Sequence, residues 1–581
     1  MDELMYEPLK YYESAAHEKH AKCSMEYFDE LVAKSGMDVE ENHKTVKAYR
    51  DELANIDKLS SRLSKFSGLR VFLILASIAG IIAAIMGIVQ LTDGNVWPAG
   101  ILMLLIGIAV AAVCIYFWFA KVNPIIKDAN AVLEAQKQKA ADLLAQAEAQ
   151  MASLNSLFDD TDTYKVFEKT IPEFKFNTAF SPKHEDLLAS QNDFVNVMDI
   201  ESSVVNTLAG SFCGNPFLYY RYNQHEMGTQ DYQGSLYIEW TETYRDSDGN
   251  LRTRDCSQTL YATVTKPKPY YYVCTNLAYG CQAAPDLNFT RTPTHCETLS
   301  EKELKKKIAK GEKELQKKAR KATKEGGNFQ EMANSEFEVL YGAEDRDNEV
   351  QFRLMFTPLA QRNTVSLLRN TVGYGDDFHV VKRRRCTTIS SEHSQNWNMN
   401  TTAEHYKSYD LETARTNFLN FNHEFFRSVY FDFAPLMSVP AYLDSPVPSM
   451  EDPKYDRNYT DYEHEALANG IGQAAFSADG TITDTILKTS FLSREDDVDV
   501  VQVDAYSYTG EERIDYVPVL GGDKRYHNVP VHWIEYIPLL KTSNIAVKAY
   551  NMSEREFRDS DVKFPNNGAY MHGLLAYLLD N

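Results

Sequence analysis

Cysteine is sparse in this sequence, with eight residues among 581. Cys274, Cys281 and Cys296 lack the closely spaced pairs of a zinc site, and the overall density is far below that of a disulfide scaffold. Reduced structural thiols are the expected state, as in a cytoplasmic protein. The sequence therefore predicts neither a metal site nor a disulfide framework.

The common catalytic signatures are absent as well. The chain has no GxSxG nucleophile elbow, no phosphate-binding loop and no dinucleotide fingerprint. His423-Glu424 and the segment Tyr462–Glu465 place a histidine beside a carboxylate, but no second histidine follows at the spacing of a metalloprotease motif. We therefore assign no catalytic, cofactor-binding or metal-binding residue, and the sequence leans against an enzyme.

Charged residues are missing from two apolar runs, Val71–Leu91 and Ile101–Ala120, which predict a transmembrane hairpin. At the helical rise, 21 and 20 residues each span roughly 30 Å, the thickness of a bilayer hydrocarbon core. Ion and proton pathways usually need an ionisable residue at membrane depth, and neither run has one. The hairpin is expected to anchor the protein rather than to transport.

The short loop between the two runs, Thr92–Gly100, contains no lysine or arginine, whereas basic residues flank the other ends of the spans, among them Arg70 and Lys121. Because basic flanks are retained in the cytoplasm, both termini are predicted to be cytoplasmic and the protein to lie in the cell membrane. Aromatic residues expected at the membrane interface are Trp97, Tyr116, Phe117, Trp118 and Phe119.

Small residues recur at four-residue spacing in the spans. The sets are Ala76, Gly80 and Ala84, then Ala79, Ala83 and Gly87, and in the second run Gly107 and Ala111. Such faces allow close helix packing, either within the hairpin, which we favour, or between copies of the chain.

Helical segments flank the spans and predict a cytoplasmic stalk. Residues 7–34 read as a helix that stops at Ser35-Gly36, and residues 39–66 and 126–157 carry apolar residues near the spacing of a coiled-coil seam. The two seam-bearing segments are expected to pair antiparallel; the alternative is that each packs on the globular domain. A homo-oligomer formed through the spans or the stalk also stays open.

Short strands and turns dominate from about Tyr164 onward. The clearest hairpin is Gly234–Tyr244 with Leu251–Thr265 across the turn Asp246–Asn250, and Pro267 and Pro269 are expected to end its second strand. Further strands are expected at 336–341, 349–357, 481–491, 498–508, 514–520 and 529–539, with a turn at Gly521–Asp523, helices at Leu411–Phe433 and Met571–Leu579, and a proline-marked connection at Pro435, Pro440, Pro446, Pro448 and Pro453. The aromatic stripe of the 411–433 helix is expected in the core.

These segments give an α+β protein with a transmembrane hairpin, an antiparallel helical stalk and a large antiparallel-sheet-rich soluble domain. The expected organisation is 1–70 for N-terminal helices and the first stalk arm, 71–120 for the spans, 121–160 for the second stalk helix, 161–435 for a β-rich domain with a helical insertion at 301–325, and 436–581 for a β-rich C-terminal region.

Four segments of the middle third have distinctive sequences: Trp240–Asn250, Thr263–Pro267, Tyr270-Tyr271 and Ala284–Asn288. Through them the chain resembles a family of uncharacterised bacterial membrane proteins with two spans near the N-terminus. It implies a shared fold and a bacterial source, and it brings no function or site residue.

The insertion Glu301–Glu325 predicts a strongly basic helix, with ten lysines and Arg320 against five glutamates. Its candidate contacts with anionic lipid or a partner are Lys305, Lys306, Lys310, Lys317, Lys318 and Arg320. A solvated helix is the commoner explanation of such a run, and we favour it.

Two further patterns limit the function. The formal charge of −22 repels phosphate backbones, so no nucleic-acid partner is expected. The segment Thr371–Asp376 matches a potassium-channel selectivity filter, but it lies far downstream of both spans, so a channel is rejected and a glycine-containing turn before a helix or strand is expected.

Together these observations predict a membrane-anchored cytoplasmic interaction or scaffold protein, with the lipid bilayer and a protein as partners. The alternative is a membrane-bound enzyme of unrecognised type.

Overall fold

The computed structural model describes residues 3–92, 97–177, 179–195, 199–327, 329–395, 399–447 and 456–579, without the side chains of residues 3, 4, 92 and 97. The predicted interface position of Trp97 and the prolines Pro448 and Pro453 therefore fall outside what is described. The chain divides into two compact units: unit 1 is Met1–Tyr27, Asp159–Ala403 and Leu419–Asn581, and unit 2 is Phe28–Phe158 and Glu404–Phe418.

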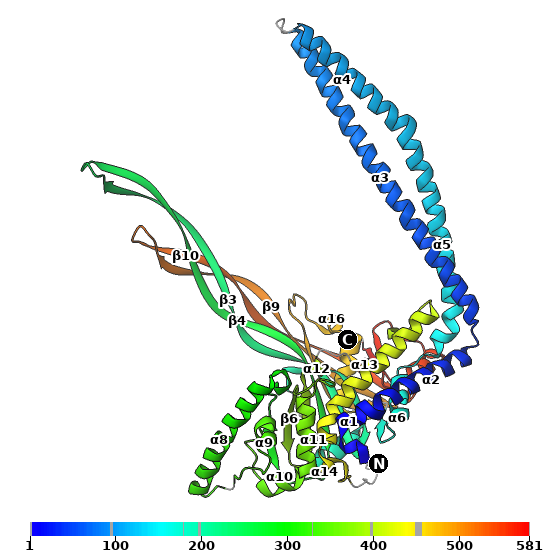
Figure 1. The fold of residues 1–581 in the computed structure, drawn as a ribbon, viewed down its shortest axis with the longest axis vertical. Helices are drawn as coiled ribbons and strands as arrows, with labels where there is room; N and C mark the ends of the chain where they lie inside the picture. Colours follow the sequence, from blue (N-terminus) through cyan, green and yellow to red (C-terminus); the bar gives the residue numbers. More distant parts are fainter. Residues whose placement is uncertain are drawn as a thin grey trace. The chain divides into compact units, whose positions relative to one another are not determined.

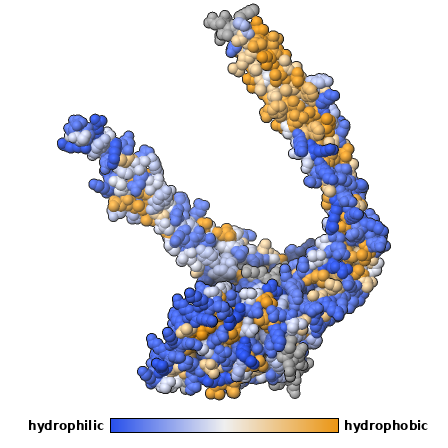
Figure 2. Space-filling view, viewed as in Figure 1, coloured by the Kyte–Doolittle hydropathy of each residue, from blue (hydrophilic) through white to orange (hydrophobic). Residues whose placement is uncertain are grey.

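Unit 2 is a long helical hairpin. α3 (Val39–Thr92) is antiparallel to α4 (Trp97–Phe117), which continues through a π-helical turn (Trp118–Val122) into α5 (Asn123–Leu157). Two helices are long and apolar enough to cross a membrane. Hydrophobic surface covers the end of this unit formed by α4 and the facing part of α3, and the surface turns hydrophilic toward α5 (Figure 2).

The helices α3 and α5 lie side by side as an antiparallel stalk (Figure 1). Lys139 of α5 pairs with Glu52 of α3 at 3.3 Å, and Gln150 reaches Thr45 at 3.1 Å, so later residues of α5 meet earlier residues of α3. Of the apolar residues predicted to line α5, Ile126, Leu133, Ala140, Ala147 and Leu154 are buried, together with Met151. On α3, Val46 is buried and Tyr49, Ile56, Leu63 and Phe66 are half-buried, whereas Val39 and Leu53 are 44% and 42% exposed.

Unit 1 contains two antiparallel sheets, which confirms the α+β class. The first has the order β1-β2-β3-β4-β7-β6-β5, formed by β1 (Phe174–Phe176), β2 (Ser202–Phe212), β3 (Asn215–Arg245), β4 (Leu251–Gly280), β5 (Asn288–Arg291), β6 (Phe378–Arg383) and β7 (Cys386–Ser391). The second has the order β11-β12-β10-β9-β8, formed by β8 (Ile486–Glu495), β9 (Val498–Leu520), β10 (Tyr526–Ala549), β11 (Gly568–Met571) and β12 (Leu574–Leu578).

The two longest hairpins, β3/β4 and β9/β10, extend beyond their sheets and lie side by side as one arm (Figure 1). Along β3 the burial alternates residue by residue, as it should in a ribbon with one covered face. The covered faces meet in an apolar cluster of Ile238, Leu260, Ala262, Val529 and Val531. Each ribbon therefore buries one of its faces against the other ribbon. An isolated hairpin has no such buried face and is only marginally stable.

Helices surround the sheets of unit 1. They are α1 (Pro8–Tyr11), α2 (His17–Ser35), α6 (Asp162–Thr170), α7 (Pro182–Asn192), α8 (Glu301–Glu325), α9 (Ser335–Tyr341), α10 (Glu349–Met355), α11 (Pro358–Arg369), α12 (Glu392–Gln395), α13 (Leu411–Met437), α14 (Pro440–Leu443), α15 (Asp461–Ile471), α16 (Gln473–Phe476) and α17 (Glu554–Arg558), with α2 and α13 shared between the units. The predicted core stripe of α13 is confirmed at Phe425, Val429 and Phe433, which are at most 1% exposed.

Two predicted strands are wrong, because 335–341 and 349–355 are the helices α9 and α10. Asn334 and Asn348 cap them by accepting hydrogen bonds from the Phe337 and Gln351 amides at 3.2 and 3.1 Å. The aromatic residues that suggested strands instead pack at four-residue spacing, as Phe352 does on Phe356 at 4.6 Å between ring centroids.

Other boundaries also differ from expectation. Met571–Leu579 forms no helix, because β12 completes the sheet between β10 and β11. β4 continues through Pro267 and Pro269. The two prolines lie two residues apart, so both missing N–H groups point to the same edge of the strand. On that edge the pairing of β4 with β7 begins only at Leu277, beyond both prolines. The segments 498–508 and 514–520 are one strand, and Pro435 lies inside α13 rather than at a boundary.

Candidate functional site

The basic residues predicted as contacts lie on α8. Leu304 and Leu315 are its buried residues, so the narrow apolar stripe is used within unit 1. Lys318 is bound to Glu344 at 3.0 Å and Lys310 faces Glu314 at 3.7 Å, whereas Lys305, Lys306, Lys317 and Arg320 are exposed. Lys310 is exposed as well, so five of the six predicted contact residues face solvent, and Lys302, Lys313, Lys321 and Lys324 extend this basic surface.

The channel-like segment Thr371–Asp376 is a turn that leads into β6. The Asp376 carboxylate pairs with the buried Arg291 and accepts a hydrogen bond from Thr294 Oγ1 at 2.8 Å. Cys296, Glu297 and Asp376 are close enough to hold a metal ion, but the guanidinium of Arg291 already neutralises Asp376. The contacts of Asp376 with Arg291 and Thr294 hold this turn within unit 1. The expected glycine-containing turn before a helix or strand is confirmed, and the element that follows it is the strand β6.

The two histidines noted in the sequence do not meet each other. His464 is fully buried, with Asp499 3.5 Å from Nε2 and Asp461 3.9 Å from Nδ1, and these carboxylates raise its pKa against the opposing effect of burial. His423 is half-buried, with its ring 5.0 Å from that of His17. His464 is thus a core group, closed to a substrate.

A cavity of about 370 Å³ lies beside residues that the sequence did not single out, and we call it the His572 cavity. Its lining combines amide and hydroxyl groups, aromatic rings and carboxylates, namely Asn206, Asn400, Asn469, Thr401, Thr402, Tyr164, Tyr570, Asp160, Glu554 and His572, with Val205, Gly470 and Met571. The β2/β3 pairing has a bulge between Val204 and Asn206, at the wall of this cavity. Bulges of this kind often re-aim side chains next to functional sites.

His572 lies in the two-residue turn between β11 and β12. His572 and Gly573 have φ values of +53° and +79°, the left-handed pair that such a hairpin turn requires. Glycine adopts this conformation freely, whereas a histidine there is strained, and strained residues concentrate at functional sites. The turn holds the imidazole at the cavity.

Glu463 of α15 orients this imidazole. Its carboxylate lies 3.0 Å from His572 Nδ1 and accepts hydrogen bonds from the Phe180 amide and Thr207 Oγ1, each at 2.7 Å. The His572 side chain is 13% exposed while Glu463 is fully buried, and the carboxylate raises the pKa of His572 against the opposing effect of burial. With Nδ1 engaged, Nε2 is the nitrogen available to the cavity, as in carboxylate–histidine pairs that carry out acid–base chemistry.

Asp160 brings a second titratable group to the same cavity. Burial, followed by the adjacent carboxylate of Asp159, raises its pKa to about 8, while the Glu554 amide donates to it at 3.4 Å. Arg555 lies 4.0 Å from Asp159. At neutral pH the Asp160 carboxyl therefore keeps its proton, next to a carboxylate that has lost its own.

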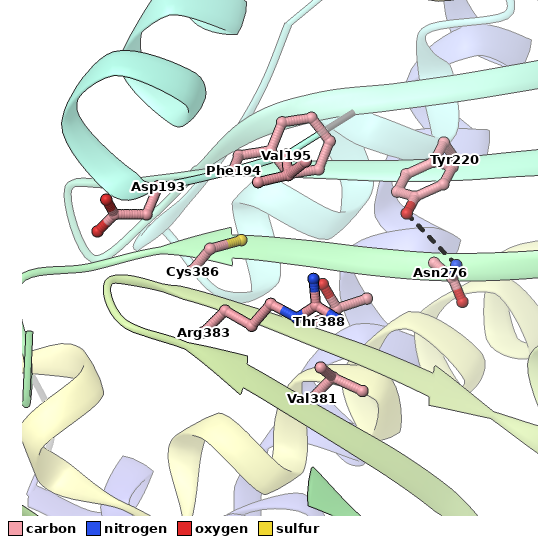
Figure 3. Close-up of a pocket in the computed structure, with 9 residues that line it drawn as sticks. All are labelled: Asp193, Phe194, Val195, Tyr220, Asn276, Val381, Arg383, Cys386 and Thr388. Carbon is pink, nitrogen blue, oxygen red and sulfur yellow. Dashed lines mark hydrogen bonds between the residues drawn. The ribbon is translucent and has the colours of Figure 1, made fainter. Parts of the chain in front are cut away.

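A second cavity, of about 200 Å³, lies between the β3–β4–β7–β6 strands and the segment after α7 (Figure 3). Burial raises the pKa of the Cys386 thiol to about 12, so this sulfur is no nucleophile at neutral pH. Tyr220 accepts a hydrogen bond from Asn276 at 3.3 Å, and Asp193 lies 3.8 Å from the guanidinium groups of Arg384 and Arg385. Tyr220, Asn276 and Asp193 are thus engaged and the thiol is unreactive, which favours the His572 cavity as the chemical site.

The arm offers a surface of another kind. The outer face of the β9/β10 ribbon carries an exposed apolar set that we call the ribbon patch: Ile514, Tyr516, Pro518, Leu520 and Tyr526. Tyr516 and Tyr526 are 65% and 74% exposed, and Tyr526 lies opposite Leu520. Arg513, which precedes Ile514 and lies on the opposite face of the strand, is paired with Glu511 and Glu535, both at 2.6 Å. Exposed apolar groups gathered on one face are typical of protein-binding surfaces.

Comparison of the chain with models of protein families, with curated proteins and with solved structures finds no significant match. The resemblance of Trp240–Asn288 to two-span bacterial membrane proteins therefore stays a prediction. Function has to be argued from the surfaces and cavities of the chain itself.

Proposed function

We propose that this protein is a membrane-anchored interaction protein that binds a partner protein through the ribbon patch. The ribbon patch is the observation that carries the proposal. Four of its side chains, Ile514, Tyr516, Leu520 and Tyr526, are each at least 46% exposed on a ribbon whose other face is buried. Large apolar side chains gathered on one exposed face favour protein binding, with tyrosine among the most enriched residues.

In this proposal the apolar parts of α3 and α4 lie in the cell membrane and both termini lie in the cytoplasm. The apolar composition of the spans and the basic residues Arg70 and Lys121 at their outer ends support this orientation. A reporter fused to either terminus should be active only in the cytoplasm. Activity on the outer side of the membrane would contradict the orientation.

Exposed basic residues of α8 are a second candidate contact, for anionic lipid or an acidic partner. Lys305, Lys306, Lys317 and Arg320 support it by facing solvent. The buried stripe of α8 equally supports a solvated helix, so the ribbon patch is the surface to test first.

The matched experiment is photo-crosslinking from two tyrosines of the arm. A photoreactive amino acid replaces Tyr526 in the ribbon patch or Tyr261 on the outer face of the other ribbon, which are 74% and 71% exposed. Position 526 should give a discrete protein adduct in intact cells, and position 261 should not. Equal crosslinking from both positions, or none from position 526, would contradict the proposed surface.

A second candidate function is a membrane-bound enzyme. The His572–Glu463 pair at a cavity, 3.0 Å between Nδ1 and Oε2, is the specific observation that favours it.

A further inference from the structure

The His572 cavity has the charge distribution of a site for a positively charged ligand. Among the described residues that line it, none is lysine or arginine, and two are carboxylic acids, Asp160 and Glu554. The one basic lining residue, His572, is neutralised by Glu463 at 3.0 Å. The rings of Tyr164 and Tyr570 complete the walls. Carboxylates bind ammonium groups through charge-assisted hydrogen bonds, and aromatic faces attract cations.

Burial and the neighbouring Asp159 raise the pKa of Asp160, and a cation beside Asp160 would oppose both effects. Asp160 and Asp159 are adjacent carboxyl groups, and Arg555 lies 4.0 Å from Asp159. Crowding by Asp159 and burial together keep Asp160 protonated at neutral pH. A cation beside Asp160 would favour its ionised form in the way that a neighbouring arginine does.

A metal ion fits this cavity poorly. In the described part of the chain, Cys296, Glu297 and Asp376 form the one group of three His, Cys, Asp or Glu residues whose ligand atoms lie within 4.8 Å of one another. Asp160, Glu554 and His572 do not form such a group. The cavity volume, about 370 Å³, suits an organic molecule of several carbon atoms.

We propose that the His572 cavity binds an organic cation with primary ammonium groups, of the aliphatic diamine class, beside its two carboxyl groups, Asp160 and Glu554. The ammonium group lies beside Asp160 and Glu554, and it replaces the proton that hydrogen-bonds the Asp160 carboxyl group to Asp159. Asn469 on α15 offers an amide oxygen to the cavity, because its Oδ1 atom is buried and accepts no hydrogen bond from the described residues. The Oδ1 atom of Asn206, at the β2 bulge, already accepts a hydrogen bond from the Thr207 amide at 2.8 Å. This proposal stands apart from the partner-binding proposal, because it concerns another part of unit 1.

Proton release makes binding depend on pH. Titratable or charged groups from several elements surround Asp160. They are Asp159 beside it in sequence, Asp162, Tyr164 and Lys165 on α6, Glu554 and Arg555 on α17, Tyr570 on β11, and His572 with its partner Glu463. Below a pH of about 8, Asp160 is protonated in the free protein. In this range each increase of one pH unit should strengthen binding by up to about tenfold, which is the limit for one released proton. An aliphatic ammonium group keeps its charge over this range.

Calorimetric titration of the full chain in detergent tests the proposal, with 1,4-diaminobutane as probe and 1,4-butanediol as the uncharged control. The diamine should bind saturably, more tightly at pH 8 than at pH 6.5, and the diol should not. Titrations in two buffers of different ionisation enthalpy should show that about one proton is released per bound diamine.

Asp160→Asn should weaken diamine binding by about tenfold or more and abolish proton release, because the variant cannot ionise. Asparagine imitates the protonated acid, so the fold should be retained. Glu554→Gln, at a half-buried position, is the second variant and should also weaken binding. Asp231→Asn on the arm is the matched control and should bind as the parent does.

No saturable heat, equal binding of the diol, or unchanged affinity in both Asp160→Asn and Glu554→Gln would overturn the proposal. Each result is independent of crosslinking at Tyr526, so the two proposals stand or fall separately.

Discussion

Gly107 of α4 faces Gly80 of α3 so closely that a Cβ atom on Gly107 would lie 2.6 Å from the Gly80 carbonyl oxygen. A Cβ atom on Gly80 would in turn lie 2.9 Å from the Gly107 carbonyl oxygen. The small residues of the spans therefore serve packing within the hairpin, the interpretation favoured from their spacing.

Gly107→Val should accordingly destabilise the hairpin, by about 1–3 kcal/mol as for other overpacked sites. The measurement is the Tm of the full chain in detergent, together with hydrogen exchange of residues 71–120. Gly68→Ala in α3 is the control, since a Cβ atom on Gly68 would meet nothing within 4 Å beyond its neighbours and the backbone of its own helix. If both variants exchange like the parent, the close approach of the two helices is wrong.

Asp376 and Arg291 form a buried ion pair in which both side chains are 0% exposed. Asp376→Asn leaves the guanidinium without its counter-charge and should cost about 3–5 kcal/mol of unfolding free energy. Glu301→Gln breaks the exposed pair with Arg369, where the glutamate is 73% exposed, and should cost less than about 1 kcal/mol. Denaturant unfolding of the two variants should separate them clearly; equal losses would contradict a structural role for the turn.

Local signals explain how much of the fold was predictable. The capping box at Ser300 and Glu303, the lysine-rich surface and Gly326 define α8 within a short stretch of chain, and the sequence predicted this helix correctly. Gly521–Asp523 likewise marked the β9/β10 turn. The short helices α9 and α10 were missed because their aromatic residues resemble strand composition, and only contacts with each other and with Phe289 show a helical cluster.

The candidate site was hidden for a different reason. His572 and Glu463 are 109 residues apart, and Asp160 lies some 300 residues before Glu463, so no motif spacing links them. One local signal was available: His572-Gly573 separates two short apolar runs, as a two-residue hairpin turn does. Reading Met571–Leu579 as a helix concealed it. The ribbon patch was equally unpredictable, since exposure of Tyr516 depends on which face of β9 the other ribbon covers.

Acid should destabilise the protein through two buried neutral histidines. Burial lowers the pKa of His20 to about 3 and that of His184 to about 4. Between these values and the unfolded value of about 6.5, the unfolded chain binds more protons than the folded one, so stability falls as pH falls through this window. His393 and His572 act in the opposite direction, because their raised pKa values add stability that is lost as pH rises.

His184→Gln isolates one contribution. Between pH 6 and pH 4.5, each unit by which the pH is lowered should reduce the free energy of unfolding of the parent by up to about 1.4 kcal/mol more than that of the variant. Glutamine retains a polar group near the Asn177 amide and the Phe217 carbonyl oxygen, which His184 contacts at 3.0 Å each. The measurement is the free energy of unfolding against pH, with exposed His43→Gln as control. Parallel pH profiles for the parent and His184→Gln would show that this histidine is not the acid-sensitive group.

Gly234 lies where the two ribbons of the arm approach closely, because a Cβ atom there would collide with the Pro530 carbonyl oxygen. Gly234→Val should therefore separate the ribbons and expose the cluster of Ile238, Leu260, Ala262, Val529 and Val531. Hydrogen exchange should quicken in residues 226–245 and 526–540, while β12 and α15 exchange as before.

Ser235→Val is the matched control for this change, because Ser235 is the next residue, exposed on the outer face of β3 opposite Tyr261. The same side chain is thus introduced on the two faces of one strand. Since the ribbon patch needs the β9/β10 ribbon held rigid, Gly234→Val should also reduce crosslinking from position 526, and Ser235→Val should not. Equal exchange in the two variants would mean that the ribbons do not pack on each other in solution, and the arm would then be two independent hairpins.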